Sequence, residues 1–120
     1  MAIALWFTAI LLTGIYLVAG STKLLRPKEK LAPRMRWVED FSARQVKAIG
    51  AIEVICALGV ILPIVTGIAP VLTAVAAAAL VVFQFVAATV HVRRREVSML
   101  AVNSVLALVA ASIVVLYAVA

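Results

Sequence analysis

The stretch KAIGAIEVICALGVILP, residues 47–63, places one acidic residue inside a long apolar run. Only five residues separate Glu53 from Lys47, the last basic residue before the run. If the run forms a membrane-spanning helix that starts near Ala48, Glu53 lies roughly 8 Å along it, at a rise of about 1.5 Å per residue. A charge exposed to lipid costs several kcal/mol, so we expect this carboxylate to have a partner inside the protein.

The whole chain is apolar enough to make lipid its natural surroundings. Its 120 residues are 67% hydrophobic and 13% charged, with a mean hydropathy of +1.23, whereas soluble domains have roughly 45–50% apolar and about 25% charged residues. Four apolar runs, at residues 2–20, 48–66, 68–92 and 97–120, are long enough to span a bilayer. Spanning segments must satisfy their own backbone hydrogen bonds, so all four are predicted helices. The sequence predicts one all-α domain, residues 1–120, an integral membrane four-helix bundle.

All eleven Lys and Arg residues lie in two connections. Eight belong to residues 21–47, and three, Arg93, Arg94 and Arg95, lie between the third and fourth runs. The positive-inside rule places both connections in the cytoplasm and both termini outside it. We therefore expect a multi-pass protein of the bacterial plasma (inner) membrane, N-out/C-out, with a cytoplasmic basic loop at 21–47. Anionic lipid headgroups explain the net charge of +6, and nucleic acid is not an expected partner.

The basic loop contains an amphipathic segment. Trp37 and Phe41 are four residues apart and would share one face of a helix. We expect this segment to lie on the inner leaflet of the bilayer, with docking of a cytosolic protein as the alternative. Contacts with the membrane surface or a partner are therefore predicted for Trp37, Phe41, Arg34, Arg36, Arg93, Arg94 and Arg95.

Short signals mark the ends of the second and third spans. Ser42, with Gln45 three residues later, predicts a capping box at the start of the second span. Pro63 falls near the end of that span, and Pro70 suits the first turn of the next. The short connection between them predicts antiparallel neighbours.

The predicted topology gathers the polar residues of the spans in the cytoplasmic half of the bilayer. The candidate ligand-binding residues are Glu53, Lys23, His91, Gln84, Tyr16 and Asn103. Ionisable groups within a span face the bundle or a cavity, so we expect a polar pocket around Glu53. The partner of its carboxylate is expected to be Lys23, His91 or a loop arginine. Two interpretations stay open, a structural ion pair that fixes helix packing and a site for a ligand or proton.

Several kinds of chemistry have no pattern in this sequence. Cys56 is the single cysteine, so a dithiol mechanism within this chain is excluded. His91 is accompanied by no Cys/His set, so no metal is expected. No Gly-rich phosphate loop or nucleophile–base pair is visible by spacing, so no catalytic residue is assigned. No basic residue precedes the first run, which favours a retained helix over a cleaved signal peptide.

Three stretches together resemble the DoxX-like family of small bacterial four-helix membrane proteins. They are GIYLVAGSTKLLRP in the first run, VKAIGAIEVICALGVILP in the second and FVAATVHVRRREV closing the third. Their order and spacing match that family nearly end to end. The resemblance implies an inner-membrane bundle in which Lys23, Glu53 and His91 are the family-like polar residues. It also implies a redox setting, since some DoxX-type proteins are associated with thiosulfate–quinone oxidoreduction or with thiol-stress complexes.

Three functions follow as hypotheses. The first is a small membrane subunit or scaffold of a redox-related or stress-related complex, with another membrane or cytosolic protein as partner. The second is a subunit of a membrane oxidoreductase that binds quinone or another small amphiphile. Glu53 and His91 would then handle the proton, while Tyr16 and Gln84 hold a carbonyl. The third is a proton-coupled transporter that works as a homo-oligomer. The isolated chain is not expected to be an enzyme.

Overall fold

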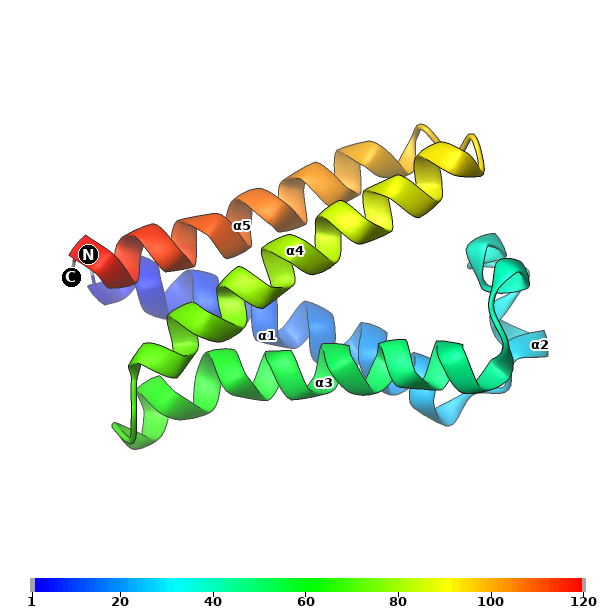
Figure 1. The fold of residues 1–120 in the computed structure, drawn as a ribbon. Coiled ribbons are helices and arrows are strands. Elements are labelled where there is room, and N and C mark those ends of the chain that lie inside the picture. The colour runs from blue at the N-terminus through cyan, green and yellow to red at the C-terminus, as the bar shows by residue number, and fades with distance from the viewer. Residues whose placement is uncertain (1, 120) are drawn as a thin grey trace.

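The computed structural model describes residues 2–119, and these residues form helices and no strand (Figure 1). The long helices are α1 (Ala2–Leu25), α3 (Ala43–Thr66), α4 (Val71–Arg93) and α5 (Met99–Val119). A short helix, α2 (Lys28–Leu31), and a 3₁₀ helix, η1 (Arg36–Asp40), lie between α1 and α3. All four long helices are long and apolar enough to cross a membrane. The predicted all-helical architecture with four candidate spans is confirmed.

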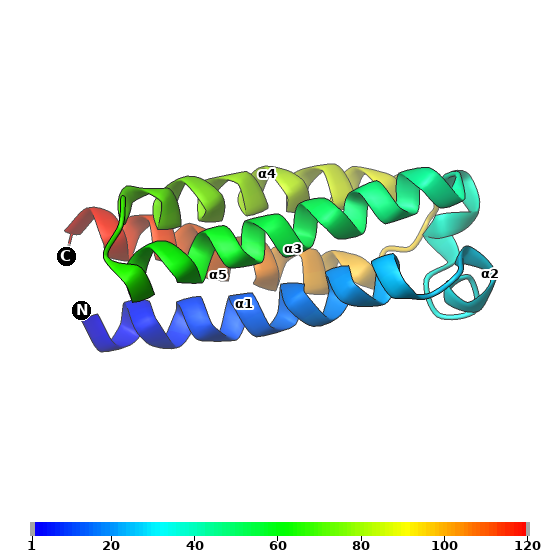
Figure 2. The same ribbon diagram turned by 90° about the horizontal axis from the view of Figure 1, so that it is seen from below.

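The four long helices form a ring in which each packs mainly against two others (Figure 2). α1 contacts α3 and α5, and α4 contacts the same two helices from the opposite side. The two ends of the chain lie at one end of the bundle, and the connection that holds α2 lies at the other (Figure 2). The turn between α4 and α5 lies at that second end too (Figure 1). We call the end of the bundle that holds these two connections the connection end.

Two helix boundaries differ from the prediction on either side of the basic loop. α1 continues to Leu25 instead of ending at residue 20, and α3 begins at Ala43 instead of 48. The ammonium group of Lys47 donates to the carbonyl oxygen of a residue in the last turn of α1, Leu24, at 2.7 Å. At the start of α3, Ser42 and the residue three positions later form the predicted capping box. Residues 26–42, rather than 21–47, therefore connect the helices.

Left-handed backbone conformations accompany the other two shifted boundaries. α4 begins at Val71 instead of 68, and α5 begins at Met99 instead of 97. Gly67 ends α3 with φ 71°, a conformation that glycine adopts at little cost. Arg95 has φ 61° in the turn after α4. A residue in the left-handed conformation interrupts a right-handed helix, so α3 ends before Gly67 and α4 ends before Arg95.

The outer surface of the bundle is apolar, and the interior holds polar side chains. Ile55, Phe85 and Leu108 point outward and are 68%, 67% and 69% exposed. The buried polar residues are Thr13, Lys23, Glu53, Thr73, Gln84, His91 and Asn103. A soluble bundle has the opposite distribution. This arrangement suits a bundle whose solvent is lipid, where polar groups must find partners inside the protein.

The backbones of α1 and α3 touch at Gly20 and Gly50. A Cβ atom on Gly50 would lie 2.8 Å from both the Gly20 carbonyl oxygen and the Lys23 Cβ, and a Cβ on Gly20 would lie 2.7 Å from the Gly50 carbonyl oxygen. Neither position has room for a side chain. Small residues let helices approach closely in lipid, where van der Waals packing drives association. The contact brings together the turns that carry Lys23 and Glu53.

Replacing Gly50 by alanine is expected to separate α1 from α3. The added methyl group meets backbone atoms that cannot move aside, so Gly50→Ala should lower the free energy of unfolding by about 1–3 kcal/mol. The matched control is Gly14→Ala, because a Cβ on Gly14 meets nothing within 4 Å. Unfolding in mixed detergent micelles, followed by circular dichroism, measures both variants. Equal stability of the two proteins would contradict the close contact.

Candidate functional site

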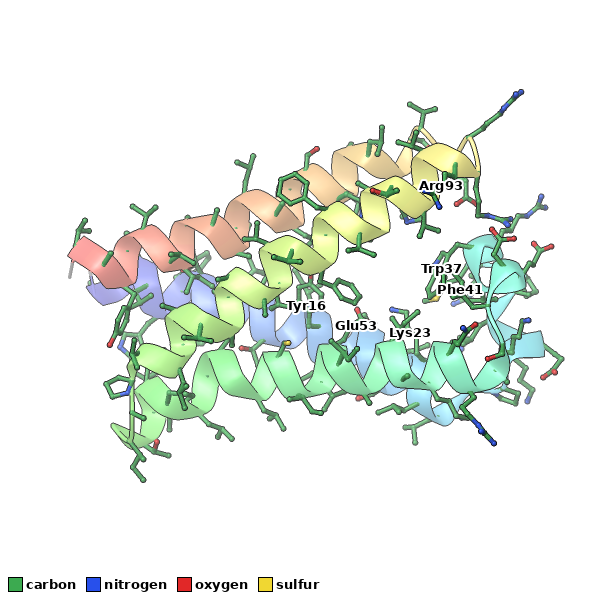
Figure 3. All side chains as sticks on the ribbon, in the orientation of Figure 1. Tyr16, Lys23, Trp37, Phe41, Glu53 and Arg93 are labelled. Atoms are coloured by element: carbon green, nitrogen blue, oxygen red, sulfur yellow. The ribbon has the colours of Figure 1, made fainter. Side chains whose placement is uncertain are left out.

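A cavity of about 500 Å³ lies inside the bundle toward the connection end. Its wall is largely apolar and includes Phe83, Val90 and Leu106. Six polar residues from the four long helices also line it: Tyr16, Lys23, Glu53, Gln84, His91 and Asn103. Figure 3 shows Tyr16, Lys23 and Glu53 on the side of the bundle formed by α1 and α3. The structure thus brings all six sequence-predicted ligand-binding residues to one cavity.

Lys23 and Glu53 form an ion pair at one side of this cavity. The Lys23 Nζ atom lies 2.5 Å from Glu53 Oε1, and the two residues are only 7% and 3% exposed. Of the three partners expected for the carboxylate, the structure selects Lys23. The ammonium also lies 5.7 Å from the centre of the Trp37 ring, within reach of a cation–π interaction. Removing either charge alone would leave the other buried without its counter-ion.

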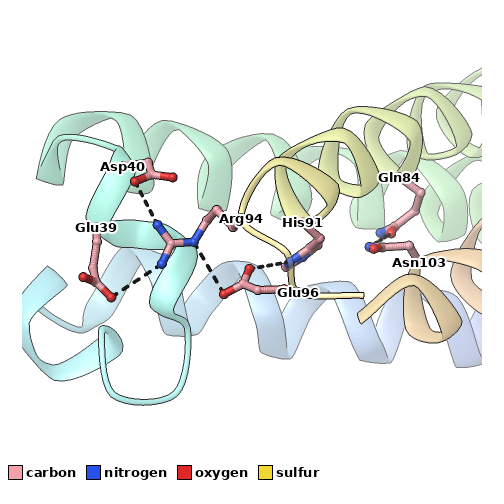
Figure 4. Close-up of polar contacts among 7 residues, drawn as sticks. All are labelled: Glu39, Asp40, Gln84, His91, Arg94, Glu96 and Asn103. Atoms are coloured by element: carbon pink, nitrogen blue, oxygen red, sulfur yellow. Dashed lines mark hydrogen bonds and ion pairs between the residues drawn. The ribbon is translucent and has the colours of Figure 1, made fainter. Parts of the chain in front are cut away.

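A chain of hydrogen bonds crosses the cavity from α1 to α5. The Gln84 side-chain amide donates to the Tyr16 hydroxyl. The Asn103 amide donates to Gln84 Oε1 at 2.8 Å (Figure 4). The chain ends at Asn103, whose Oδ1 atom is buried and has no partner among residues 2–119. Turning both amides around would leave the Nδ2 group without an acceptor instead. One polar atom of Asn103 stays unsatisfied in either orientation.

His91 closes the α4 side of the cavity near the connection end. Its Nδ1 atom lies 2.9 Å from Glu96 Oε1, in the turn after α4 (Figure 4). Sequence reasoning did not select Glu96 as a site residue, although it is the second-last residue of the stretch FVAATVHVRRREV. A loop carboxylate five residues after a histidine gives no helical spacing signal. The backbone of this turn brings them together, because the Glu96 amide donates to the His91 carbonyl oxygen at 2.8 Å.

The 3₁₀ helix η1 and Phe41, which together we call the cap (residues 36–41), cover the connection end of the cavity. The rings of Trp37 and Phe41 line the cavity and contact each other edge to face, with centroids 5.6 Å apart. Arg94 holds the cap from the opposite side of the bundle, since its Nη1 atom lies 2.8 Å from Asp40 Oδ1 (Figure 4). The hydrogen bond to Asp40 raises the pKa of the Arg94 guanidinium. Weaker contacts reach Glu39 at 3.7 Å and Glu96 at 3.4 Å.

Comparison with known proteins places the chain in a family. The sequence model of the DoxX-like family matches residues 7–113. The chain belongs to the DoxX-like family. No curated protein and no solved structure matches it. Family membership and four apolar helices together indicate a multi-pass membrane protein. The matched range contains every residue of the cavity described above.

The residues predicted for the membrane surface of this DoxX-like protein fall into three groups. Trp37 and Phe41 are half-buried and line the cavity, and contact of their remaining surface with lipid or a partner stays a prediction. Arg94 is engaged by carboxylates of the protein itself. Arg36, Arg93 and Arg95 are exposed, and Arg34 lines a separate groove on the outer side of α1. Contact of these arginines with lipid or a partner stays a prediction.

The described residues of this DoxX-like protein contain no group of three His, Cys, Asp or Glu side chains that could hold a metal ion. Cys56 is half-buried and packs against the apolar core between the helices. The chemical groups at the cavity are therefore an ion pair, an imidazole, a phenol and two amides. This set is suited to hydrogen bonding and to proton exchange.

Removing the Arg94 charge is expected to loosen the cap without unfolding the bundle. Ion pairs near the surface add little to stability, because water and salt screen them, so Arg94→Gln should leave global stability nearly unchanged. Trp37 should nevertheless meet more water, and its fluorescence should shift to longer wavelength. The measurement uses a Trp6→Phe background, which leaves Trp37 as the single tryptophan. Arg93→Gln is the matched control, and an identical spectrum for the two variants would contradict a cap held by Arg94.

Proposed function

We propose that this DoxX-like protein binds one uncharged amphiphile, a quinone being the leading candidate, in the cavity between its helices. The observation that supports the proposal most is the largely apolar cavity of about 500 Å³ that six polar side chains from all four long helices line. Ligand pockets typically have volumes of roughly 300–1,000 Å³, with apolar walls and a few polar groups. Each hydrogen bond between the ligand and one of these side chains would contribute about 0.5–1.5 kcal/mol.

The polar groups retain hydrogen-bonding capacity that the protein itself does not use. The Lys23 ammonium has three donors and makes one hydrogen bond, and Glu53 Oε2 accepts none from residues 2–119. The Tyr16 hydroxyl accepts from Gln84 and keeps its own hydrogen available. A ligand carbonyl would meet donors here, and a ligand hydroxyl would meet acceptors. Both the quinone and quinol forms of one headgroup would therefore find partners, with Glu53 and His91 placed to exchange the proton.

Charge balance favours an uncharged headgroup over an anionic or cationic one. Lys23 and Glu53 neutralise each other, and the carboxylate of Glu96 is shared with Arg94. A charged ligand would add an uncompensated charge to a low-dielectric site, which costs several kcal/mol. A carbonyl or hydroxyl adds no such charge.

The ligand tail would enter directly from the lipid. Val86 lines the cavity and is also 60% exposed on the outer surface of α4, so the cavity reaches the lipid-facing side. Val102 on α5 likewise lines the cavity and is 47% exposed. An amphiphile could keep its tail among lipid chains while its headgroup contacts the polar residues.

Native mass spectrometry after extraction in mild detergent tests this function. The protein should carry a small uncharged amphiphile, or take up a short-chain ubiquinone when stripped. Asn103→Leu and Tyr16→Phe should each weaken that binding roughly tenfold, the effect of losing one net hydrogen bond. Ser104→Leu is the control, because Ser104 is exposed on the adjacent position of α5. A protein that carries no amphiphile and takes up no quinone would overturn the proposal.

The orientation of the protein follows from its charges. We propose that the connection end faces the cytoplasm of a bacterial inner membrane and that both termini lie outside. Every Lys and Arg lies at or near the connection end: on α1 after Gly20, in the two connections, at the start of α3 or at the end of α4. Basic residues are enriched on the cytoplasmic side of membrane proteins. The test is maleimide labelling of the Ser98→Cys variant in a Cys56→Ala background. The side of the membrane from which the reagent reaches this cysteine is the side on which the connection end lies.

A role as a membrane subunit of a redox-related or stress-related complex is the second candidate. Arg36, Arg44, Arg93 and Arg95 are exposed at the connection end, as Figure 3 shows for Arg93, and they could dock an acidic surface of a partner. Isolation in gentle detergent should then recover a second polypeptide that is lost when these arginines are reversed in charge. Proton-coupled transport by a homo-oligomer would instead require solute flux in proteoliposomes that depends on Glu53.

A further inference from the structure

A second hollow lies on the outer side of α1, away from the bundle interior. It has a volume of about 460 Å³ and runs from the apolar surface of α1 to the connection that contains α2. We call it the outer groove. Its apolar part lies on α1 and is formed by Ile15, Val18 and Ala19. Leu31 and Met35 of the connection between α1 and α3 cover the groove. Val18 is 69% exposed, so the groove opens directly toward the surrounding lipid.

Three cationic side chains line the part of the outer groove nearest the connection: Arg26, Lys30 and Arg34. No acidic residue lines the groove. Among residues 2–119, no carboxylate forms an ion pair with any of the three. Two other cations of this end of the bundle are engaged, since Lys28 donates to the Phe41 carbonyl oxygen and Lys47 to that of Leu24. Three uncompensated positive charges around one hollow repel each other unless an anion lies between them.

We propose that the outer groove binds an anionic phospholipid. Its phosphate would lie among Arg26, Lys30 and Arg34, where guanidinium groups can donate paired hydrogen bonds to phosphate oxygens. One acyl chain would run down α1 over Ile15 and Val18 toward the centre of the membrane. Charge at one end and an apolar wall at the other match a phospholipid, whereas free phosphate would leave the apolar part empty.

A lipid bound here would also support the cap indirectly. The cavity between the helices, which we call the inner cavity, shares a wall with the outer groove. The shared lining residues are Ile15, Ala19 and Met35. Leu31, which covers the groove, is buried in a small apolar cluster with Val38 of the cap. The lipid would therefore brace the same connection that carries Trp37 and Phe41.

Native mass spectrometry can compare two lipids that differ in headgroup charge. The intact protein in mild detergent is titrated with dioleoylphosphatidylglycerol and, separately, with dioleoylphosphatidylcholine. Each basic residue near an anionic headgroup contributes a factor of about five, so the anionic lipid should bind roughly a hundredfold more tightly. Arg26→Gln, Lys30→Gln and Arg34→Gln combined should reduce that preference to within about threefold. Arg36→Gln, Arg93→Gln and Arg95→Gln combined remove the same charge elsewhere and should leave the preference intact.

A second variant tests the apolar part of the groove without changing the charge. Val18→Trp places an indole on the exposed face of α1 and should block the acyl chain, reducing binding of the anionic lipid about tenfold. Glycerol phosphate, which lacks acyl chains, should fail to displace the lipid. Equal binding of the two lipids, equal losses in the two triple variants, unchanged binding by Val18→Trp or displacement by glycerol phosphate would each overturn the proposal.

Discussion

The Lys23–Glu53 ion pair is the interaction on which the rest of this structure depends. Two opposite charges buried in a membrane bundle are tolerated only in direct contact, and that contact requires the backbones of α1 and α3 to touch at Gly20 and Gly50. At the other end of the bundle, α3 and α4 approach closely near Gly59. Figure 1 shows α4 diverging from α3 toward the connection end. The inner cavity lies in this wider part, beside the ion pair.

The buried polar side chains are of two kinds. Some only join helices, and others keep unused hydrogen-bonding capacity at the candidate site. The Thr13 and Thr73 hydroxyls donate to backbone carbonyl oxygens of α3, and neither residue lines the cavity, so they join helices. Lys23 and Glu53 instead keep unused donors and acceptors beside the cavity. In lipid, unused polar capacity is costly, and a bundle built only for packing would avoid it. This surplus is the physical reason for assigning the cavity a ligand.

The sequence was sufficient to predict the helices and the residues around the cavity, because both follow from regular spacing. Glu53 lies three residues after Gly50, as Lys23 does after Gly20, and lipid forces such residues inward. The cap could not be predicted in the same way. Trp37 and Phe41 have the same spacing whether they face lipid or a cavity, and the difference is set by Arg94, which is distant in sequence. Glu96 was missed because the backbone of a turn, and no helical period, brings it to His91.

The amphiphile content of a protein without the central ion pair tests the central claim most directly. Replacing Lys23 and Glu53 together by methionine removes both charges and leaves neither unpaired, so the double variant should fold, as buried pairs replaced by apolar residues commonly do. Native mass spectrometry then measures how much amphiphile the folded protein retains. Our account predicts a folded bundle that has lost its amphiphile, since the headgroup would have lost its partners. A folded double variant that retains the amphiphile at the native level would show that the pair only holds helices together.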